Sequence, residues 1–220
     1  MTDLSDLDRA LITALGARVG AGRARSRDES VIALRAVLAE AGGVSPALVR
    51  TLWSRIEAGN AGPVSVWGPL SALLAADRFG HGVRSAHDPE AALKAAREGG
   101  RAVLDLGRTT PWWARLLAQP DLRVTAALPD DASGRPLALV VSGEEIGPTG
   151  DDRTFWVVEA PGDEAKITDL LAQRGLAGAP LETAGGLKLF MLAGYVQPDD
   201  GRLIAPTGRL SGVIGAAPVF

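Results

Sequence analysis

The pattern of apolar and polar residues changes once along the chain. Up to about residue 60, apolar positions recur only at three- and four-residue steps, as one face of an amphipathic helix requires. From residue 62 onward, short apolar runs alternate with further helical stretches, which is typical of strands and helices in an α/β domain. We therefore expect a helical domain over residues 1–60 and an α/β domain over residues 62–220.

Three helices are predicted in the N-terminal domain. The first carries a single apolar stripe, made of Leu4, Leu7, Leu11, Ile12, Leu15 and Val19. The second begins after Ser26, because residues 26–29 have the S-x-x-E form of a capping box. The third begins at Ser45-Pro46, an N-cap followed by proline at the first helical position. Three such helices bury little surface alone, so we expect them to pair with a second copy or to pack on the rest of the chain.

The second domain is predicted to alternate strands and helices. Strands are expected over residues 64–67, 101–107, 136–143, 154–161 and 187–196, and helices over residues 70–79, 89–100, 112–119 and 163–175. The glycine-rich tail ends in a further apolar strand candidate. This alternation favours a sheet with at least partly parallel pairing. The predicted fold class is therefore α + α/β, a helical domain followed by a mixed α/β domain.

Composition narrows the function classes. The 220 residues are 46% hydrophobic and 22% charged, the balance of a soluble globular protein. A net charge of −3 gives no overall attraction to nucleic acid, so any anion must be bound by local arginine clusters. There is no cysteine, and neither His81 nor His87 has a partner at metal-ligand spacing, so neither metal nor cofactor is expected. No membrane span and no secretion signal is expected, which predicts a cytoplasmic protein.

Positive charge gathers at the turn between the first two helices. Arg18, Arg23, Arg25 and Arg27 lie there among glycines. Arginine in the first turn of a helix is locally unfavourable, because that end already carries partial positive charge. One interpretation is a basic, solvated turn. The other is an anion site in which guanidinium groups hold two carboxylates by bidentate pairs.

The helical segments also resemble a known family. The stretches DRALITALGAR (8–18), SRDESVIALRAVLAE (26–40) and SPALVRTLWSRI (45–56) are similar to the three helices of the all-helical chorismate mutases. In that family a small intertwined dimer converts chorismate to prephenate. The resemblance implies that Arg18 binds a substrate carboxylate from the middle of the first helix. It likewise implies a catalytic arginine–acid pair at Arg27 and Asp28, where the acid stands in place of the family's glutamate.

The resemblance implies further substrate contacts and has two gaps. Arg23 or Arg25 would substitute for the cation late in the first helix. The family's glutamine late in the third helix would fall near Val64 and is missing, and Asn60 is the nearest amide. The family's arginine near the start of the first helix, which crosses the dimer, would fall at about Met1 and is also missing.

The second domain resembles prephenate dehydratase, a periplasmic-binding-protein-like α/β fold. The stretch HDPEAALKAAREGGRAVLDLG (87–107) is similar to the dehydratase segment in which a helix leads into a buried strand. The family's Thr-Arg-Phe run is broken, because residues 152–155 read Asp-Arg-Thr-Phe. Dehydratase activity is therefore not expected.

Two places in this domain are candidates for ligand contact. Arg108 and Thr110 precede Trp112-Trp113, so this segment either binds an anion beside a stacking ring or contains two packed tryptophans. Asp105 at a strand end is either a ligand contact or a capping acid.

Two functions follow. The first is a chorismate mutase-like isomerase of aromatic amino-acid biosynthesis, which positions a dicarboxylate and stabilises charge with no covalent step. The alternative is a catalytically weakened binding or regulatory protein that senses an aromatic carboxylate. The missing arginine and glutamine favour the alternative, and the arginine cluster favours the isomerase. A homodimer is expected in both cases. Replacing Arg18 or Arg27 is expected to weaken dicarboxylate binding and to change folding stability little.

Overall fold

The computed structural model describes residues 4–21, 25–58, 62–80, 82–107, 110–131, 134–203 and 210–220. The helices are α1 (Leu4–Gly20), α2 (Arg27–Glu40), α3 (Pro46–Ala58), α4 (Pro69–Phe79), α5 (Pro89–Arg97) and α6 (Glu164–Gln173), with the 3₁₀ helices η1 (Trp112–Ala118) and η2 (Gly201–Leu203). The strands are β1 (Val64–Trp67), β2 (Arg84–Ser85), β3 (Arg101–Asp105), β4 (Arg123–Leu128), β5 (Ala138–Ser142), β6 (Asp152–Glu159), β7 (Gly178–Ala184), β8 (Leu187–Ala193) and β9 (Ser211–Pro218).

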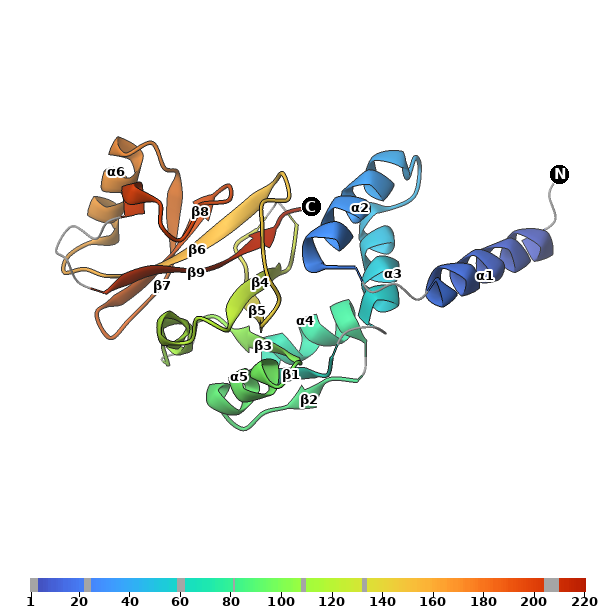
Figure 1. Cartoon of the computed structure of the whole chain (residues 1–220), viewed down its shortest axis with the longest axis horizontal. Helices are drawn as coiled ribbons and strands as arrows, with labels where there is room; N and C mark the ends of the chain where they lie inside the picture. Colours follow the sequence, from blue (N-terminus) through green and yellow to red (C-terminus); the bar gives the residue numbers. More distant parts are fainter. Residues whose placement is uncertain are drawn as a thin grey trace.

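The strands form one mixed sheet in the order β2-β1-β3-β5-β4-β9-β6-β8-β7. The pairs β1–β2, β1–β3 and β4–β9 are parallel and the others are antiparallel. The predicted mixed α/β architecture with partly parallel pairing is confirmed. We call β1–β5 with α4, α5 and η1 lobe 1, and β6–β9 with α6 lobe 2; the two lobes lie at opposite ends of the sheet (Figure 1).

One apolar cluster joins side chains of both lobes, and a second lies within lobe 2. In lobe 1, β3 and β5 are buried along nearly their whole length, so their sequences are continuous apolar runs. Helix α5 covers this part of the sheet with Ala92, Leu93 and Ala96. In lobe 2, α6 packs Ile167 and Leu171 against the aromatic and aliphatic side chains of β6 and β8.

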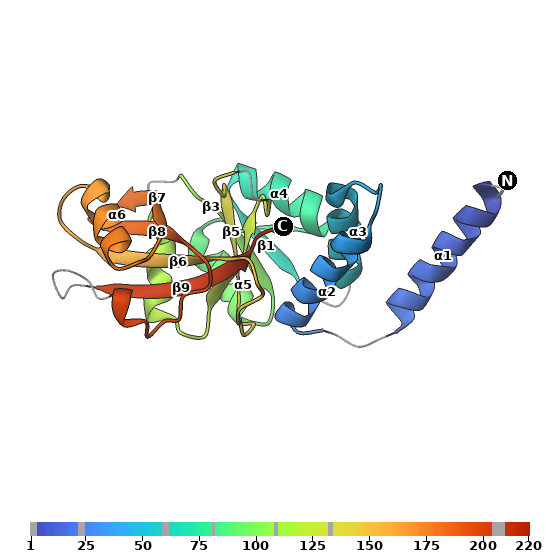
Figure 2. The same cartoon turned by 90° about the horizontal axis from the view of Figure 1, so that it is seen from above.

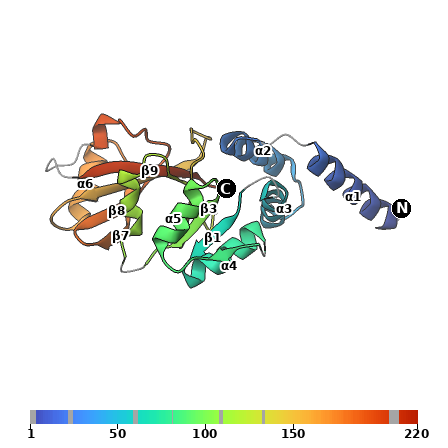
Figure 3. The ribbon, with the colours of Figure 1, turned by 60° about the horizontal axis from the view of Figure 1, so that its bottom comes forward.

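The first three helices form as predicted but do not gather into one compact domain. No residue of α1 is buried, and α1 extends away from the rest of the molecule (Figure 2). Helices α2 and α3 pack on one another, and α3 also packs on α4 of lobe 1 (Figure 3). The apolar stripe of α1 is therefore exposed within a single chain, with Leu4 75% and Ile12 70% accessible.

Several elements differ from the sequence prediction, among them the two-residue strand β2 and the short 3₁₀ helix η2, which were not predicted. The stretch predicted as a helix at 112–119 is the 3₁₀ helix η1, in which Trp112 and Trp113 are both buried. Strands β4 and β7 were not predicted. The segment of β7, Gly-Ala-Pro-Leu-Glu-Thr-Ala, has turn-forming residues, but it lies at the sheet edge with an irregularity between Pro180 and Glu182, where a strand tolerates proline.

Gly215 is required for the contact between the lobes. Its φ is +140°, and a Cβ added there would lie 2.3 Å from the Val124 carbonyl oxygen of β4. Gly215 and Val124 are also the registered pair of β4 and β9. Gly215→Ala is therefore expected to destabilise the protein by about 2 kcal/mol or more in urea unfolding. Gly20→Ala, in open space at the end of α1, should change stability by less than about 1 kcal/mol. Equal effects would refute this role.

Candidate anion-binding site

A cavity of about 540 Å³ lies where α2 and α3 meet lobe 1. This volume falls within the range of small-molecule binding sites. The helical wall is formed by Ser30, Val31, Leu34, Trp53, Ser54 and Glu57. The lobe 1 wall includes Arg78, Phe79, Arg97, Arg101, Ser142 and Glu144. Arg25 and Arg27, at the start of α2, complete the polar part of the lining.

The cavity is locally basic in a chain of net negative charge. Among the described residues, five arginines and two glutamates line it. The arginines are Arg25, Arg27, Arg78, Arg97 and Arg101, which come from the segment before α2 and from α2, α4, α5 and β3. Several guanidinium groups around a partly apolar cavity provide the bidentate donors that carboxylates prefer.

Two guanidinium groups lie over the ring of Trp53 at the helical wall. Arg18 from α1 and Arg25 each lie 5.3 Å from the centroid of the Trp53 ring. Glu57, one turn further along α3, forms an ion pair with Arg18 and lies 3.8 Å from Arg25. The indole nitrogen of Trp53 donates to the Ser30 hydroxyl at 2.9 Å, which fixes the ring against α2. The structure thus brings Arg18 and Arg25 together at Trp53 and Glu57.

Arg101 forms an ion pair with Glu144, the second glutamate of the cavity lining. The Arg101 guanidinium lies 3.1 Å from a Glu144 oxygen and 5.9 Å from the centroid of Phe79. The Ser142 hydroxyl donates to the other Glu144 oxygen at 3.0 Å. Glu144 follows β5 in the connection to lobe 2, and its side chain is 37% exposed. Glu144 is therefore paired at the cavity wall although it is partly exposed.

Two further arginines of the lobe 1 wall, Arg78 and Arg97, are paired with aspartates. Arg78 lies 3.0 Å from Asp130, which also lies 3.5 Å from Arg50 of α3. Burial lowers the pKa of Arg78, and the Asp130 carboxylate opposes this shift. Arg97 donates to Asp121 at 2.8 Å on a more exposed surface. These ion pairs hold α3, α4 and α5 in place around the cavity.

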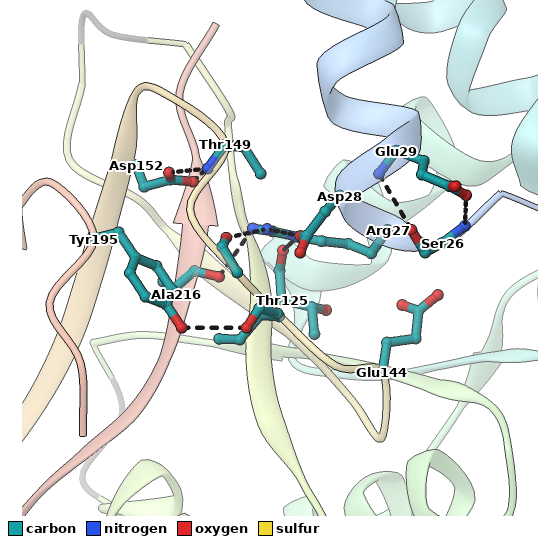
Figure 4. Close-up of polar contacts among 12 residues, drawn as sticks. Ser26, Arg27, Asp28, Glu29, Thr125, Glu144, Thr149, Asp152, Tyr195 and Ala216 are labelled. Carbon is teal, nitrogen blue, oxygen red and sulfur yellow. Dashed lines mark hydrogen bonds and ion pairs between the residues drawn. The ribbon is translucent and has the colours of Figure 1, made fainter. Parts of the chain in front are cut away.

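Arg27 lines the cavity, but its guanidinium nitrogens are bound to the protein itself (Figure 4). The side chain is buried and donates to the carbonyl oxygens of Thr125 at 3.2 Å, Ala216 at 3.2 Å and Gly147 at 3.4 Å. It also pairs with Asp28 at 2.6 Å. These carbonyls belong to β4, to β9 and to the connection between the lobes. Arg27 therefore fastens α2 to both lobes, which replaces the expectation that its substitution barely affects stability.

The capping box explains why Arg27 points into the protein. The Ser26 hydroxyl accepts from the Glu29 amide at 3.2 Å, and the Glu29 carboxylate accepts from the Ser26 amide at 2.9 Å (Figure 4). This predicted start of α2 is confirmed. Arg27 is consequently the first helical residue, and the cap fixes the direction of its side chain.

The other candidate residues lie elsewhere or outside the described residues. Arg23, Asn60 and Arg108 fall among residues that the structure leaves undescribed. Thr110 is half-buried before η1 and is not part of the cavity lining. Asp105 accepts from the Ser71 amide at 2.5 Å and its hydroxyl at 2.6 Å, so the capping interpretation is confirmed.

Thr154, in the position of the broken dehydratase run, is part of the lobe 2 framework. It is fully buried, and its hydroxyl donates to the Gly194 carbonyl at 2.8 Å and accepts from the Val196 amide at 2.8 Å. Both hydrogen bonds tie β6 to the segment after β8.

The sequence did not identify the lobe 1 side of the cavity. Arg78, Arg97 and Arg101 stand at the ends of elements whose sequences match ordinary solvated charges. No local motif joins all three, because α4 and α5 come together only by packing on β3 within lobe 1. The contact of Trp53 with two arginines likewise depends on tertiary structure, because Arg18 comes from α1 and Arg25 from the segment before α2.

Comparisons with known proteins give limited similarity. No protein-family model matches the chain, and no curated protein matches it significantly. Three solved structures are partly similar. The first is GqqA, described as a novel type of quorum quenching acylase, with 16% identity, 71% of this chain and 94% of that chain covered, and a TM-score of 0.47. The others are prephenate dehydratases from Streptococcus mutans (15% identity, 73% and 99% covered, TM-score 0.45) and Staphylococcus aureus (13% identity, 70% and 99% covered, TM-score 0.47). Similarities of this size carry no information about chemistry.

No described helix is long and apolar enough to span a membrane. Within the same described ranges, histidine, aspartate and glutamate side chains do not gather in threes as a metal ion would require.

The role of Arg27 predicts a large effect of a conservative substitution. Arg27→Lys keeps the charge but loses the planar fork, leaving buried carbonyl oxygens without donors. We expect a loss of about 2 kcal/mol in urea unfolding, as for hydrogen bonds to a charged group. Arg97→Lys is the control, since its partly exposed ion pair should contribute less than about 1 kcal/mol. Similar losses in the two variants would contradict the structural role of Arg27.

Proposed function

We propose that the protein binds a small cyclic dicarboxylate of the chorismate or prephenate type in the arginine-lined cavity. The observation that carries this proposal is that Arg25 and Arg101, together with the aromatic rings of Trp53 and Phe79, line one cavity of about 540 Å³. Guanidinium groups hold carboxylates by paired hydrogen bonds, and the aromatic walls accommodate the ring. The loosely similar dehydratases fit this ligand class but add no weight.

Isomerisation of chorismate is the activity that we assign first to this site. The rearrangement is unimolecular and needs a compact conformer held in place, with stabilisation of charge on the breaking ether oxygen. In this proposal Arg18 and Arg25, which both lie over the Trp53 ring, supply the cations. No covalent group, cofactor or metal takes part in such a reaction.

A binding or regulatory protein is the second candidate, and Arg27 favours it. The resemblance assigns Arg27 to the substrate, whereas its donors are directed at the carbonyls of Thr125, Gly147 and Ala216. A site without this arginine would hold the ligand and stabilise the transition state less. Sensing of an aromatic carboxylate then remains after the loss of turnover. Dehydration of prephenate is expected in neither case.

Chorismate distinguishes the candidates in one pair of measurements. We expect calorimetry to detect chorismate binding, and the decrease of chorismate absorbance to report turnover. Binding with turnover in proportion to protein supports the isomerase, and binding without turnover supports the sensor. If chorismate, prephenate and phenylpyruvate all fail to bind at millimolar concentration, the proposed function is wrong.

Arg18 is the variant that tests the location of the site. Arg18→Ala should weaken binding of the dicarboxylate about tenfold or more, because a charge-assisted hydrogen bond is worth roughly 1.5–3 kcal/mol and tenfold corresponds to about 1.4 kcal/mol. Arg9→Ala, on the exposed part of α1, is the control and should bind as the parent does. If Arg18→Ala binds the dicarboxylate as tightly as the parent does, the helical wall is not part of the binding site.

We also propose that the functional unit is a homodimer joined through α1. The apolar stripe of α1 is exposed, and so are apolar side chains of α2, α3 and the turn between them: Ile32, Val37, Val44, Leu48 and Leu52. Exposed apolar area of this extent is typical of an interface. A second copy is the occupant that fits best, since an identical helix offers a matching stripe.

Sedimentation at micromolar concentration tests the dimer. The parent protein should sediment as a dimer, and Leu11→Glu, which places a charge in the stripe, should sediment as a monomer. Thr13→Glu is the matched control, because Thr13 lies on the opposite side of α1, and it should remain dimeric. A monomeric parent would contradict the proposed assembly.

A further inference from the structure

Two glutamates occupy anion positions on the cavity walls. Glu57 lies on the helical wall against Arg18 and Arg25, beside Trp53. Glu144 lies on the lobe 1 wall, against Arg101 and the Ser142 hydroxyl. Among the donors to these two carboxylates, Arg25, Arg101 and the Ser142 hydroxyl belong to residues that line a cavity large enough for a ligand. These carboxylates therefore mark two positions where the walls bind an anionic oxygen.

The pair at Arg101 is suited to exchange with a ligand. One hydrogen bond, at 3.1 Å, joins Arg101 to Glu144, and the glutamate side chain is more than a third exposed. Such partly solvated pairs are weak. Glu144 also follows β5 in an irregular connection, so its side chain has open solvent to move into. A ligand carboxylate that engages both arms of the Arg101 fork would replace the single contact with a paired one.

From these two positions we infer that the cavity selects ring-bearing dianions over monoanions, and that Arg101, Ser142 and Glu144 determine this selectivity. One ligand carboxylate takes the place of Glu57 on Arg25, the arginine of this pair that lines the cavity. The second takes the place of Glu144 on Arg101 and Ser142. A ligand with one carboxylate makes only one of these exchanges. This inference rests on the proposed function and extends it, because the second anchor belongs to lobe 1 and not to the helices.

Charge is consistent with a dianion. With Glu57 and Glu144 in place, the two walls already balance part of the arginine charge. When Glu57 and Glu144 move out to solvent, their arginine partners lose two negative charges. A bound dianion supplies two negative charges in their place. A neutral ring or a monoanion leaves at least one set of donors without a carboxylate, or leaves a glutamate in the way.

The experiment uses isophthalate, which carries two ring carboxylates, and benzoate, which carries one. Calorimetry on the parent protein should show isophthalate binding at least tenfold tighter than benzoate. Arg101→Met should reduce isophthalate to the affinity of benzoate. Glu144→Gln should tighten isophthalate binding about tenfold, because the competing charge is gone, and this gain should disappear in the double variant Arg101→Met/Glu144→Gln. Thermal unfolding of each variant confirms that it is folded.

Glu145→Gln is the matched control. Glu145 is adjacent in the chain, exposed and outside the cavity lining, so its replacement should leave both affinities unchanged. Equal binding of the two probes, or a Glu145→Gln effect as large as that of Glu144→Gln, would overturn the selectivity while leaving chorismate binding and the proposed function intact. If neither probe nor chorismate binds to the parent or to Glu144→Gln, the proposed function fails as well.

Discussion

The arrangement of this molecule depends on a buried guanidinium with acceptors on three sides. Arg27 connects the first turn of α2 to a carbonyl of β4, a carbonyl of β9 and a carbonyl of the connection between the lobes. Removing a guanidinium from water is costly unless its donors are satisfied, and buried carbonyls need donors equally. Because the requirements are mutual, the start of α2 can sit in only one place relative to the two lobes.

The cavity follows from that constraint. With its first turn fixed, α2 turns Val31 and Leu34 toward lobe 1, and Leu34 is only 1% exposed. Helix α3 is then held by the hydrogen bond from Trp53 to Ser30 on one side and by the Arg50–Asp130 pair on the other. Between these anchors the helices and the sheet remain apart, and the space is lined by the charged ends of α4, α5 and β3. The helical segment and lobe 1 therefore share one site.

The same constraint explains the unequal burial of the first three helices. Helices α2 and α3 are held by polar anchors on lobe 1, whereas the end of α1 touches α3 through Arg18 and otherwise leaves its apolar stripe in solvent. Helix α1 is too far from lobe 1 to be covered by it (Figure 1). In the proposed dimer, the apolar stripe of α1 from a second copy covers the stripe of the first. Arg18 would then lie between the cavity and the dimer interface.

The sequence by itself determined the local elements. The apolar stripe of α1, the capping box of α2, the Ser-Pro start of α3 and the Asp88 cap of α5 depend on neighbouring residues only, so spacing and residue type sufficed to predict them. It also indicated that arginines gather before α2. Tertiary structure decided what each arginine does. Arg18 and Arg25 meet at Trp53. Arg27 donates its hydrogen bonds to backbone carbonyls. The lobe 1 side of the cavity lining adds Arg78, Arg97 and Arg101. The segments of β4 and β7 are likewise strands because they pair with neighbouring strands of the sheet. The backbone hydrogen bonds of this pairing stabilise a strand even where the local sequence pattern does not predict one. Long-range hydrogen bonding and burial assign these roles, and neither is written in the spacing of residues along a chain.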